Sequence, residues 1–370
     1  MKPMKKAAVV LLALVLAVFL AGCNYPELYE RVLIHGIGVD WDGQAYQVTV
    51  RSSSSAEDEG EELFTCHGST VLEALSSLSL STGREPFYSH NYLVVFGMNC
   101  ARRGLDDCLD FFVRYYNTRP SVSMFLAENT AEEVLSAEKD GKLMKMSQLQ
   151  ALGVGGRYNG KALDIELLDF VNAAKSEGAA PVLPVLAASE EGAEAVSTAY
   201  FQGYKVKGIL SLDQTRGYLA AMGQLEKGEL VVESSAGTVT LSLRDGESRI
   251  RLLPNGIEAG DVPEFAIEIQ LDADVSAISG RRQDSENFYS ELEEAAAQLV
   301  REQTESVLAQ AMREDRCDVF DLSGLLYRKR TGFWREHGEN WQGLMPQCPC
   351  RVEVGVKVRR LEEENLRGLD

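Results

Sequence analysis

Apolar and polar positions follow two different periods along residues 23–135. Short runs rich in Val, Ile and Leu, typical of buried strands, alternate with stretches whose apolar residues recur every three or four positions, as in helices. The strand-like runs lie at residues 32–39, 46–50, 92–96 and 122–126. Alternation of this kind predicts an N-terminal α/β domain over 23–135, with helices lying on a sheet.

Short motifs mark the turns and helix starts between these runs. Asp42-Gly43 separates the first two strand-like runs and predicts a hairpin. Thr70 and Thr130 each precede a Glu by three residues, the spacing of a capping box at the start of a helix. The polar, acidic stretch 52–62 lacks an apolar period and is expected to be a loop.

Residues 136–195 are predicted to form either a small second domain or the completion of the first. Their Gly- and Lys-rich part, 139–160, is expected to be irregular. A helix is predicted at 163–174 and a strand at 182–187. The stretch 190–197 consists of small and acidic residues, which makes it the best candidate for a linker.

Residues 198–370 are predicted to form a C-terminal α+β domain. After a strand-like run at 200–212 and a helix at 213–222, several runs alternate apolar and polar residues, as half-buried strands do. Asp245-Gly246 predicts a hairpin turn between two of them. The whole chain is therefore predicted to be a multi-domain α+β protein whose antiparallel or mixed sheets are each packed with helices.

One long amphipathic helix is predicted from 287 to 313. At 1.5 Å per residue it would be about 40 Å long, and it is expected to lie across the C-terminal sheet. Its apolar stripe consists of Phe288, Leu292, Ala296, Leu299, Gln303, Val307 and Ala311.

The N-terminus has the pattern of an export signal. Three lysines precede an apolar run at residues 7–20, which is shorter than the roughly 20 residues needed to span a bilayer. The run ends in Leu20-Ala21-Gly22-Cys23, which resembles a bacterial lipobox. Residues 1–22 are therefore interpreted as a signal peptide that is removed. Cys23 is interpreted as the lipidation site, where the thiol carries a diacylglyceryl group and the new N-terminus can carry an N-acyl chain such as palmitate. A plain secretory signal with a chance cysteine is the other interpretation.

Charge makes some partners poor candidates. The formal net charge is -19, and removal of the three leader lysines would make it more negative. An acidic body gains nothing from an anionic membrane surface or from nucleic acid, so the lipid would have to provide the anchoring. No later apolar run approaches the length of a membrane span, and the body is expected to be soluble.

Several side chains have both a functional and a structural interpretation. His90, at the start of a strand, is a candidate proton switch, although a structural hydrogen-bonding role is more usual. Trp334 and Trp341, seven residues apart, fit either an interface anchor or, as we prefer, core packing. Asp272 and Asp274 share one face of a strand and suggest a cation site or, more simply, a solvated face.

Sequence motifs for catalysis, metals or cofactors are missing. The run Gly153–Gly156 neither follows a strand nor opens a helix, as a phosphate loop must. Cys348 and Cys350 lie at the upper limit of disulfide geometry, and the four histidines do not group with the cysteines as zinc ligands would. No nucleophile elbow, zincin pair or Walker loop occurs, so we expect no enzyme, no cofactor and no metal.

Several segments together resemble the Ger(x)C family of spore germination lipoproteins. Gly36-Ile37-Gly38-Val39-Asp40 is similar to its G-I-G-[IV]-D strand, and Gln214-Thr215-Arg216-Gly217 matches a helix signal of the family. The other similar segments are Leu78–Arg84, His90-Asn91, Asp110–Phe112, and Trp334, Trp341 and Pro346 before the strand 352–358. Asn24–Leu28 departs from the Trp-Asp-x-x-Glu stretch common in the family, which puts a local contact near Cys23 in doubt.

The resemblance implies a function in spore germination. Family members are the C subunits of nutrient germinant receptors, lipoproteins on the outer face of the inner spore membrane that assemble with integral membrane A and B subunits. The resemblance also implies three α+β domains without a recognised active site, and a part in receptor assembly or signal transmission. The alternative from a different class is a solute-binding lipoprotein of a membrane transporter, which would use a cleft between two α/β lobes.

Overall fold

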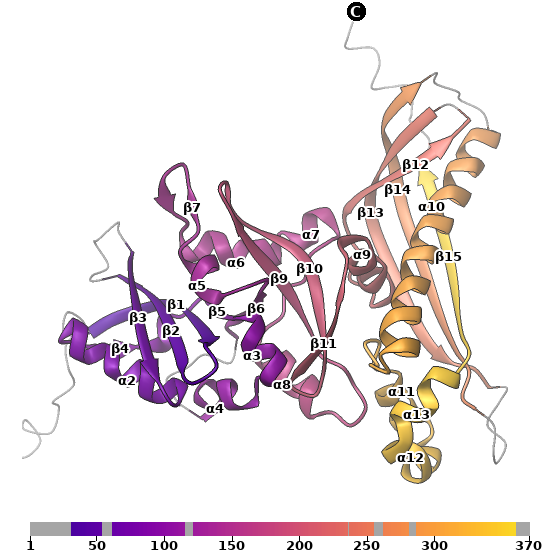
Figure 1. Cartoon of the computed structure of the whole chain (residues 1–370). Helices are drawn as coiled ribbons and strands as arrows, with labels where there is room; N and C mark the ends of the chain where they lie inside the picture. Colours follow the sequence, from indigo (N-terminus) through magenta and orange to yellow (C-terminus); the bar gives the residue numbers. More distant parts are fainter. Residues whose placement is uncertain are drawn as a thin grey trace, which may run out of the picture.

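The computed structural model describes residues 31–53, 61–114, 121–235, 237–254, 262–280 and 286–359. The predicted signal peptide and Cys23 lie outside the described residues, as does most of the predicted loop at 52–62. Figure 1 shows two sheets at opposite ends of the molecule, each packed with helices, which confirms the predicted α+β fold class. None of the helices within the described ranges has the length and apolar character that crossing a bilayer requires.

The first sheet has nine strands and a parallel centre. Its strand order is β11-β10-β9-β6-β5-β1-β2-β3, and β4 also pairs with β1. Neighbours among β1, β5, β6 and β9 are parallel, whereas the outer strands form hairpins. The strands are β1 Arg31–Trp41, β2 Tyr46–Ser53, β3 Glu62–Gly68, β4 Glu85–Phe87, β5 Leu93–Phe96, β6 Ser123–Ala127, β9 Val182–Ser189, β10 Gly192–Gln202 and β11 Lys205–Leu210.

Helices cover both faces of this sheet because its central strands are apolar on both sides. In β5, Val94 and Phe96 face one core, and Leu93 and Val95 face the other. The first core is closed by α2 Val71–Thr82, α3 Met98–Arg103, α4 Asp106–Arg114 and α8 Leu167–Lys175, and the second by α5 Ala131–Leu135 and α6 Met146–Val154. The smaller elements are β7 Glu138–Lys139, β8 Lys142–Leu143 and α7 Gly156–Asn159.

Two predictions for the middle of the chain are wrong. The predicted linker 190–197 is the turn and first half of a β-hairpin, in which β10 pairs with β9 from Gly192 onward. The predicted irregular stretch 139–160 contains the helix α6, at whose start the Gln148 side chain accepts a hydrogen bond from the backbone N–H of Lys145 at 2.9 Å. The division of the chain into domains at 135 and 195 stays a prediction.

The C-terminal sheet has four strands in the order β12-β13-β14-β15, with β14 and β15 parallel. The long helix α10 (Glu286–Val307) lies along this sheet, as predicted, and continues into a π-helical segment at Leu308–Glu314. Val300, rather than Leu299, is fully buried on its stripe. The remaining elements are β12 Gly228–Ser234, β13 Gly237–Leu252, β14 Phe265–Gly280, β15 Cys350–Arg359, α9 Leu212–Ala221, α11 Leu322–Lys329, α12 Thr331–His337 and α13 Trp341–Leu344.

Asp245-Gly246 is not the predicted hairpin turn. Strand β13 runs through it without reversing, and the pairing register with β14 shifts between Leu243 and Asp245. A Cβ atom on Gly246 would lie 2.1 Å from the carbonyl oxygen of Leu225, so the glycine permits a close backbone approach. The motif therefore marks a β-bulge, a second setting in which glycine is favoured inside a strand.

Candidate functional site

The Gly36–Asp40 segment of β1 joins the first sheet to a helix. The Asp40 carboxylate accepts hydrogen bonds from the backbone N–H groups of Ala131 (2.8 Å) and Glu132 (3.0 Å), at the first turn of α5. Burial raises the pKa of Asp40, and the two N–H groups act in the opposite direction. The carboxylate thus caps a helix 91 residues away in sequence, which is a structural role.

Glycines around Asp40 make this junction possible. A Cβ atom on Gly38 would lie 2.9 Å from a methyl carbon of Leu135, and one on Gly97 would lie 1.9 Å from the Asp40 carboxylate. Gly97 directly follows β5, the strand after His90-Asn91, and its N–H donates to the carbonyl of Val39 at 2.8 Å. The Gly36–Asp40 segment, the end of β5 and the start of α5 are therefore parts of one packing unit.

A second junction is built from the segment Gln214–Gly217 of α9. The buried Arg216 donates to Gln303 of α10 at 3.0 Å and to the backbone carbonyl of Glu229 at 2.8 Å. A Cβ atom on Gly217 would lie 2.5 Å from the backbone carbon of Gln303, so the two helices touch backbone to backbone. Thr215 completes the junction with a 2.9 Å hydrogen bond to Thr198 of β10.

A third junction surrounds the buried carboxylate of Asp318. It accepts hydrogen bonds from the backbone N–H groups of Leu322 (2.9 Å) and Ser323 (2.7 Å) and from the indole N–H of Trp341 (3.0 Å). Burial raises the pKa of Asp318 to about 6, although these donors lower it. The backbone carbonyl of Asp318 accepts from the N–H of Ala180, just before β9, so this junction also links the two sheets.

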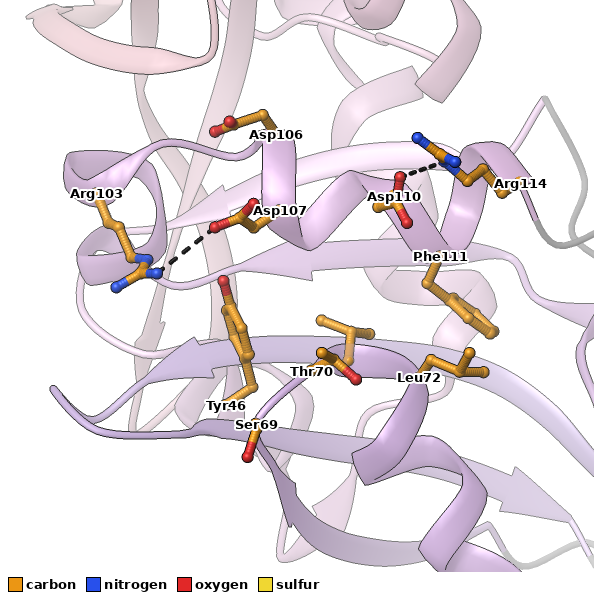
Figure 2. A pocket seen from close by; sticks show the side chains of 11 residues that line it. Tyr46, Ser69, Thr70, Leu72, Arg103, Asp106, Asp107, Asp110, Phe111 and Arg114 are labelled. Atoms are coloured by element: carbon orange, nitrogen blue, oxygen red, sulfur yellow. Dashed lines mark hydrogen bonds and ion pairs between the residues drawn. The ribbon is translucent and has the colours of Figure 1, made fainter.

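A cavity with a volume of about 630 Å³ lies between the first turn of α2 and helix α4 (Figure 2). Four of its five charged side chains form two ion pairs: Arg103 lies 3.5 Å from Asp107, and Arg114 lies 2.5 Å from Asp110, whereas the fifth is Asp106. The Arg103 guanidinium also lies 4.1 Å from the centroid of the Trp41 ring. None of the described residues lining the cavity is a histidine or a cysteine.

Tyr46 closes the floor of this cavity. Figure 2 shows its side chain pointing toward Arg103 and Asp107, and the residue is only 3% exposed. Its hydroxyl forms no hydrogen bond of ordinary geometry. Burial, followed by the neighbouring Cys108 and Asp107, raises the pKa of Tyr46, so the hydroxyl keeps its proton. A phenol that keeps its proton is a weak nucleophile.

The structure places the other predicted residues mostly in packing roles. His90 is exposed at the end of a 3₁₀ turn, with its ring 5.8 Å from that of Phe87. Trp334 and Trp341 are buried with ring centroids 5.9 Å apart, which confirms core packing, although they belong to the separate helices α12 and α13. Asp272 pairs with Arg359 at 3.2 Å and Asp274 pairs with Arg244, so arginines occupy the face proposed for a cation.

The candidate disulfide cysteines and the candidate phosphate-loop glycines have packing roles in the structure. Cys348 and Cys350 are free thiols in the structure, and burial raises the pKa of each to about 12. Contrary to the expectation from sequence, Gly156 does open a helix, the four-residue α7, where a Cβ atom would lie 1.9 Å from the carbonyl oxygen of Ala162. Within the described ranges, no three His, Cys, Asp or Glu side chains gather as metal ligands would.

The sequence matches two family models that together cover most of the chain. Residues 24–188 match a spore germination protein N-terminal domain, and residues 197–362 match a spore germination B3/GerAC-like C-terminal domain. The chain therefore belongs to the Ger(x)C family of spore germination proteins, the C subunits of germinant receptors.

Two curated proteins of Bacillus subtilis (strain 168) are similar over nearly their whole length. Spore germination protein B3 is 20% identical over 92% of this chain and 94% of its own, and spore germination protein KC is 20% identical over 96% of each. A crystal structure of the GerBC protein superposes with a TM-score of 0.61 at 17% identity, covering 88% of this chain and 97% of that one. The fold is therefore shared with GerBC, and nothing found supports the transporter alternative.

Proposed function

We propose that this chain is a lipid-anchored, non-catalytic subunit of a nutrient germinant receptor. It is held through Cys23 at the outer face of the inner spore membrane, assembles with integral membrane A and B subunits, and acts in receptor assembly or signal transmission. The observation that carries the proposal is the match of both family models, one after the other, over 24–188 and 197–362.

The chemistry of the described side chains supports a role without catalysis. The buried carboxylates Asp40 and Asp318 are both occupied as caps of helix N-termini. The buried Arg216 bonds to a side-chain amide and a carbonyl, and the two arginines of the cavity beside Tyr46 are each paired with an aspartate. Polar groups used in this way hold helices and sheets in register, which suits a protein whose work is contact with other subunits.

Anchoring through lipid is supported by the charge of the chain. A formal net charge of -19 opposes adsorption to an anionic membrane, so stable retention needs acyl chains. A diacylglyceryl group on Cys23 supplies two chains, enough for stable anchoring where one chain gives only marginal binding.

Replacement of Cys23 by Ala in the native host tests this proposal. We expect the variant to be lost from the spore membrane fraction and nutrient-triggered germination to fail, whereas a trigger that bypasses nutrient receptors still works. Cys350→Ala is the matched control, because it removes a thiol from the body of the protein and leaves the anchor intact. Normal nutrient germination in Cys23→Ala spores would contradict the anchored role.

Partner assembly is tested separately by purification from detergent-solubilised membranes. The wild-type chain is expected to bring down the A and B subunits together. Recovery of the chain as an uncomplexed monomer from native membranes would contradict the proposed assembly.

A further inference from the structure

Strand β13 has an unpaired edge near one end of the C-terminal sheet. Strand β12 pairs with it only up to Leu243, and the end of α9 covers the next residues, since the Ser248 hydroxyl donates to the carbonyl of Ala221 at 2.7 Å. From Arg249 to Leu252 the strand still pairs with β14, but no described strand pairs with its other edge. This part of β13 therefore has a strand neighbour on one side only.

The backbone groups of Ile250 and Leu252 point toward that free edge. Leu253 donates its N–H to the carbonyl of Glu264 at 2.9 Å, on the β14 side. Directions alternate along an antiparallel strand, so the N–H and C=O groups of Ile250 and Leu252 point away from β14. Phe265, opposite Leu252, has the matching direction, because its N–H donates away from β13, toward β15. Backbone groups presented in this way are a template for one more strand.

A groove with a volume of about 510 Å³ lies at this edge, between β13 and helix α11. Its half-buried apolar side chains include Ile250, Leu252 and Leu325. The other described residues that line it are Arg249, Arg251, Leu253, Pro254, Lys329 and Arg330. Figure 1 shows α11 at the end of the C-terminal sheet, next to the foot of its strands. An extended segment in this groove would have the strand backbone on one side and the helix on the other.

The groove is positively charged in an acidic protein. Its described lining has four cationic side chains and no carboxylate, whereas four other cavities of the molecule are each lined by at least two carboxylates. Of the four cations, Arg251 is paired with Glu268. The other three, Arg249, Lys329 and Arg330, form no ion pair with a described residue.

The carboxylates around the groove leave this charge in place. Glu264 is paired with Arg351 at 2.6 Å, and Asp321 is paired with Arg328 at 3.4 Å. Glu247, on the covered part of the strand, is one exposed carboxylate against the three cations. A chain with a net charge of -19 that keeps such cations beside a free strand edge favours a partner of negative charge there.

We propose that this groove binds an extended acidic segment of a partner protein, which adds to the free edge of β13 as a further strand. The backbone of the segment pairs with Ile250 and Leu252, and its apolar side chains pack against Leu325. Its carboxylates lie at Arg249 and Lys329. The proposal rests on the proposed function, in which the chain works by contact with other subunits, and it assigns one such contact to the C-terminal sheet.

Peptide binding to the full chain, purified in detergent, tests the proposal. The probe is a fluorescein-labelled peptide of alternating glutamate and valine, and a peptide of alternating lysine and valine is the charge control. We expect the acidic peptide alone to bind and to slow hydrogen exchange at the amides of Ile250 and Leu252, measured by mass spectrometry. The acidic peptide with methylated backbone nitrogens keeps its charge but cannot pair as a strand, so it is expected not to bind.

Charge reversal in the protein is the second arm of the test. Arg249→Glu combined with Lys329→Glu is expected to weaken binding of the acidic peptide at least about tenfold. Lys205→Glu combined with Lys357→Glu is the matched control, because it makes the same change of charge at exposed lysines of β11 and β15. Equal weakening by the two double variants would overturn the assignment of the groove.

The remaining outcomes also decide the matter. An acidic peptide that does not bind would leave the cations as protection of the edge against aggregation, and equal binding of the methylated peptide would exclude strand pairing. Slow exchange of both amides before any peptide is added would mean that the edge is already covered, and self-association that the peptide displaces would assign it to a second copy of this chain. Each of these results overturns the proposal, whereas loss of co-purification with the A and B subunits overturns the proposed function.

Discussion

Two buried tyrosines differ in whether the hydroxyl has a partner. The Tyr46 hydroxyl has none, whereas that of Tyr200 donates to Asp315 and accepts from Gln310. An unpartnered buried donor costs about 1–3 kcal/mol, so Tyr46→Phe is expected to leave the free energy of unfolding unchanged or raise it by about 1 kcal/mol. Tyr200→Phe is expected to lower it by about 1–3 kcal/mol. Urea denaturation of both variants measures the free energy of unfolding. Equal losses of free energy in the two variants would contradict the structure.

The buried Asp318 predicts a pH dependence of stability. Its pKa of about 6 in the folded chain lies above the ordinary value of 3.8, so folding favours the protonated form. The stabilisation is fully present below about pH 4 and is lost as the pH rises through about 6, with a total on the order of 3 kcal/mol.

Asp318→Asn removes this titration. We expect the difference in melting temperature between parent and variant to change between pH 4 and 7, because only the parent gains the contribution of Asp318 as the solution is acidified. Asp321→Asn is the control, since Asp321 caps the same helix but its side chain is 41% exposed. If the melting temperatures of the parent and of Asp318→Asn changed in parallel with pH, the raised pKa of Asp318 would be ruled out.

At the scale of elements, the helix pair α9 and α10 depends on one glycine. A Cβ atom on Gly217 would lie 2.5 Å from the backbone carbon of Gln303 and 2.6 Å from the backbone nitrogen of Thr304. Gly217→Ala should therefore push the helices apart and cost about 1–3 kcal/mol. Gly332→Ala in α12 meets nothing within 4 Å and is expected to be neutral or slightly stabilising, as alanine favours helices. Thermal unfolding measures the stability of both variants, and an equal stability of Gly217→Ala and Gly332→Ala would contradict the prediction.

Elements whose signals are local could be predicted from the sequence. The Asp42-Gly43 hairpin and the caps at Thr70 and Thr130 depend on neighbouring residues, and all three occur. The bulge at Gly246 follows from the approach of Leu225 across the fold, and no local pattern reveals it. Likewise, the small residues at 190–197 suggested a linker because their strand partners lie elsewhere in the chain.

The candidate site shows the same limit at the scale of the whole molecule. Family segments such as Gly36–Asp40 and Gln214–Gly217 were found from sequence, but not what they do, because their partners α5 and α10 lie about 90 residues away. Asp318 carried no signal at all, since its role arises only when Trp341 folds back onto it. Cys23 is defined by its local motif and stays a prediction.

The connection between the two sheets has a mechanical consequence. Strand β11 ends at Leu210, Ser211 caps the next helix, and α9 begins at Leu212, so no free linker separates them. Gln310 and Ala180 form further hydrogen bonds across the same joint. A torque applied to the C-terminal sheet by a neighbouring subunit would therefore be transmitted through this joint to β9 and β11 of the first sheet.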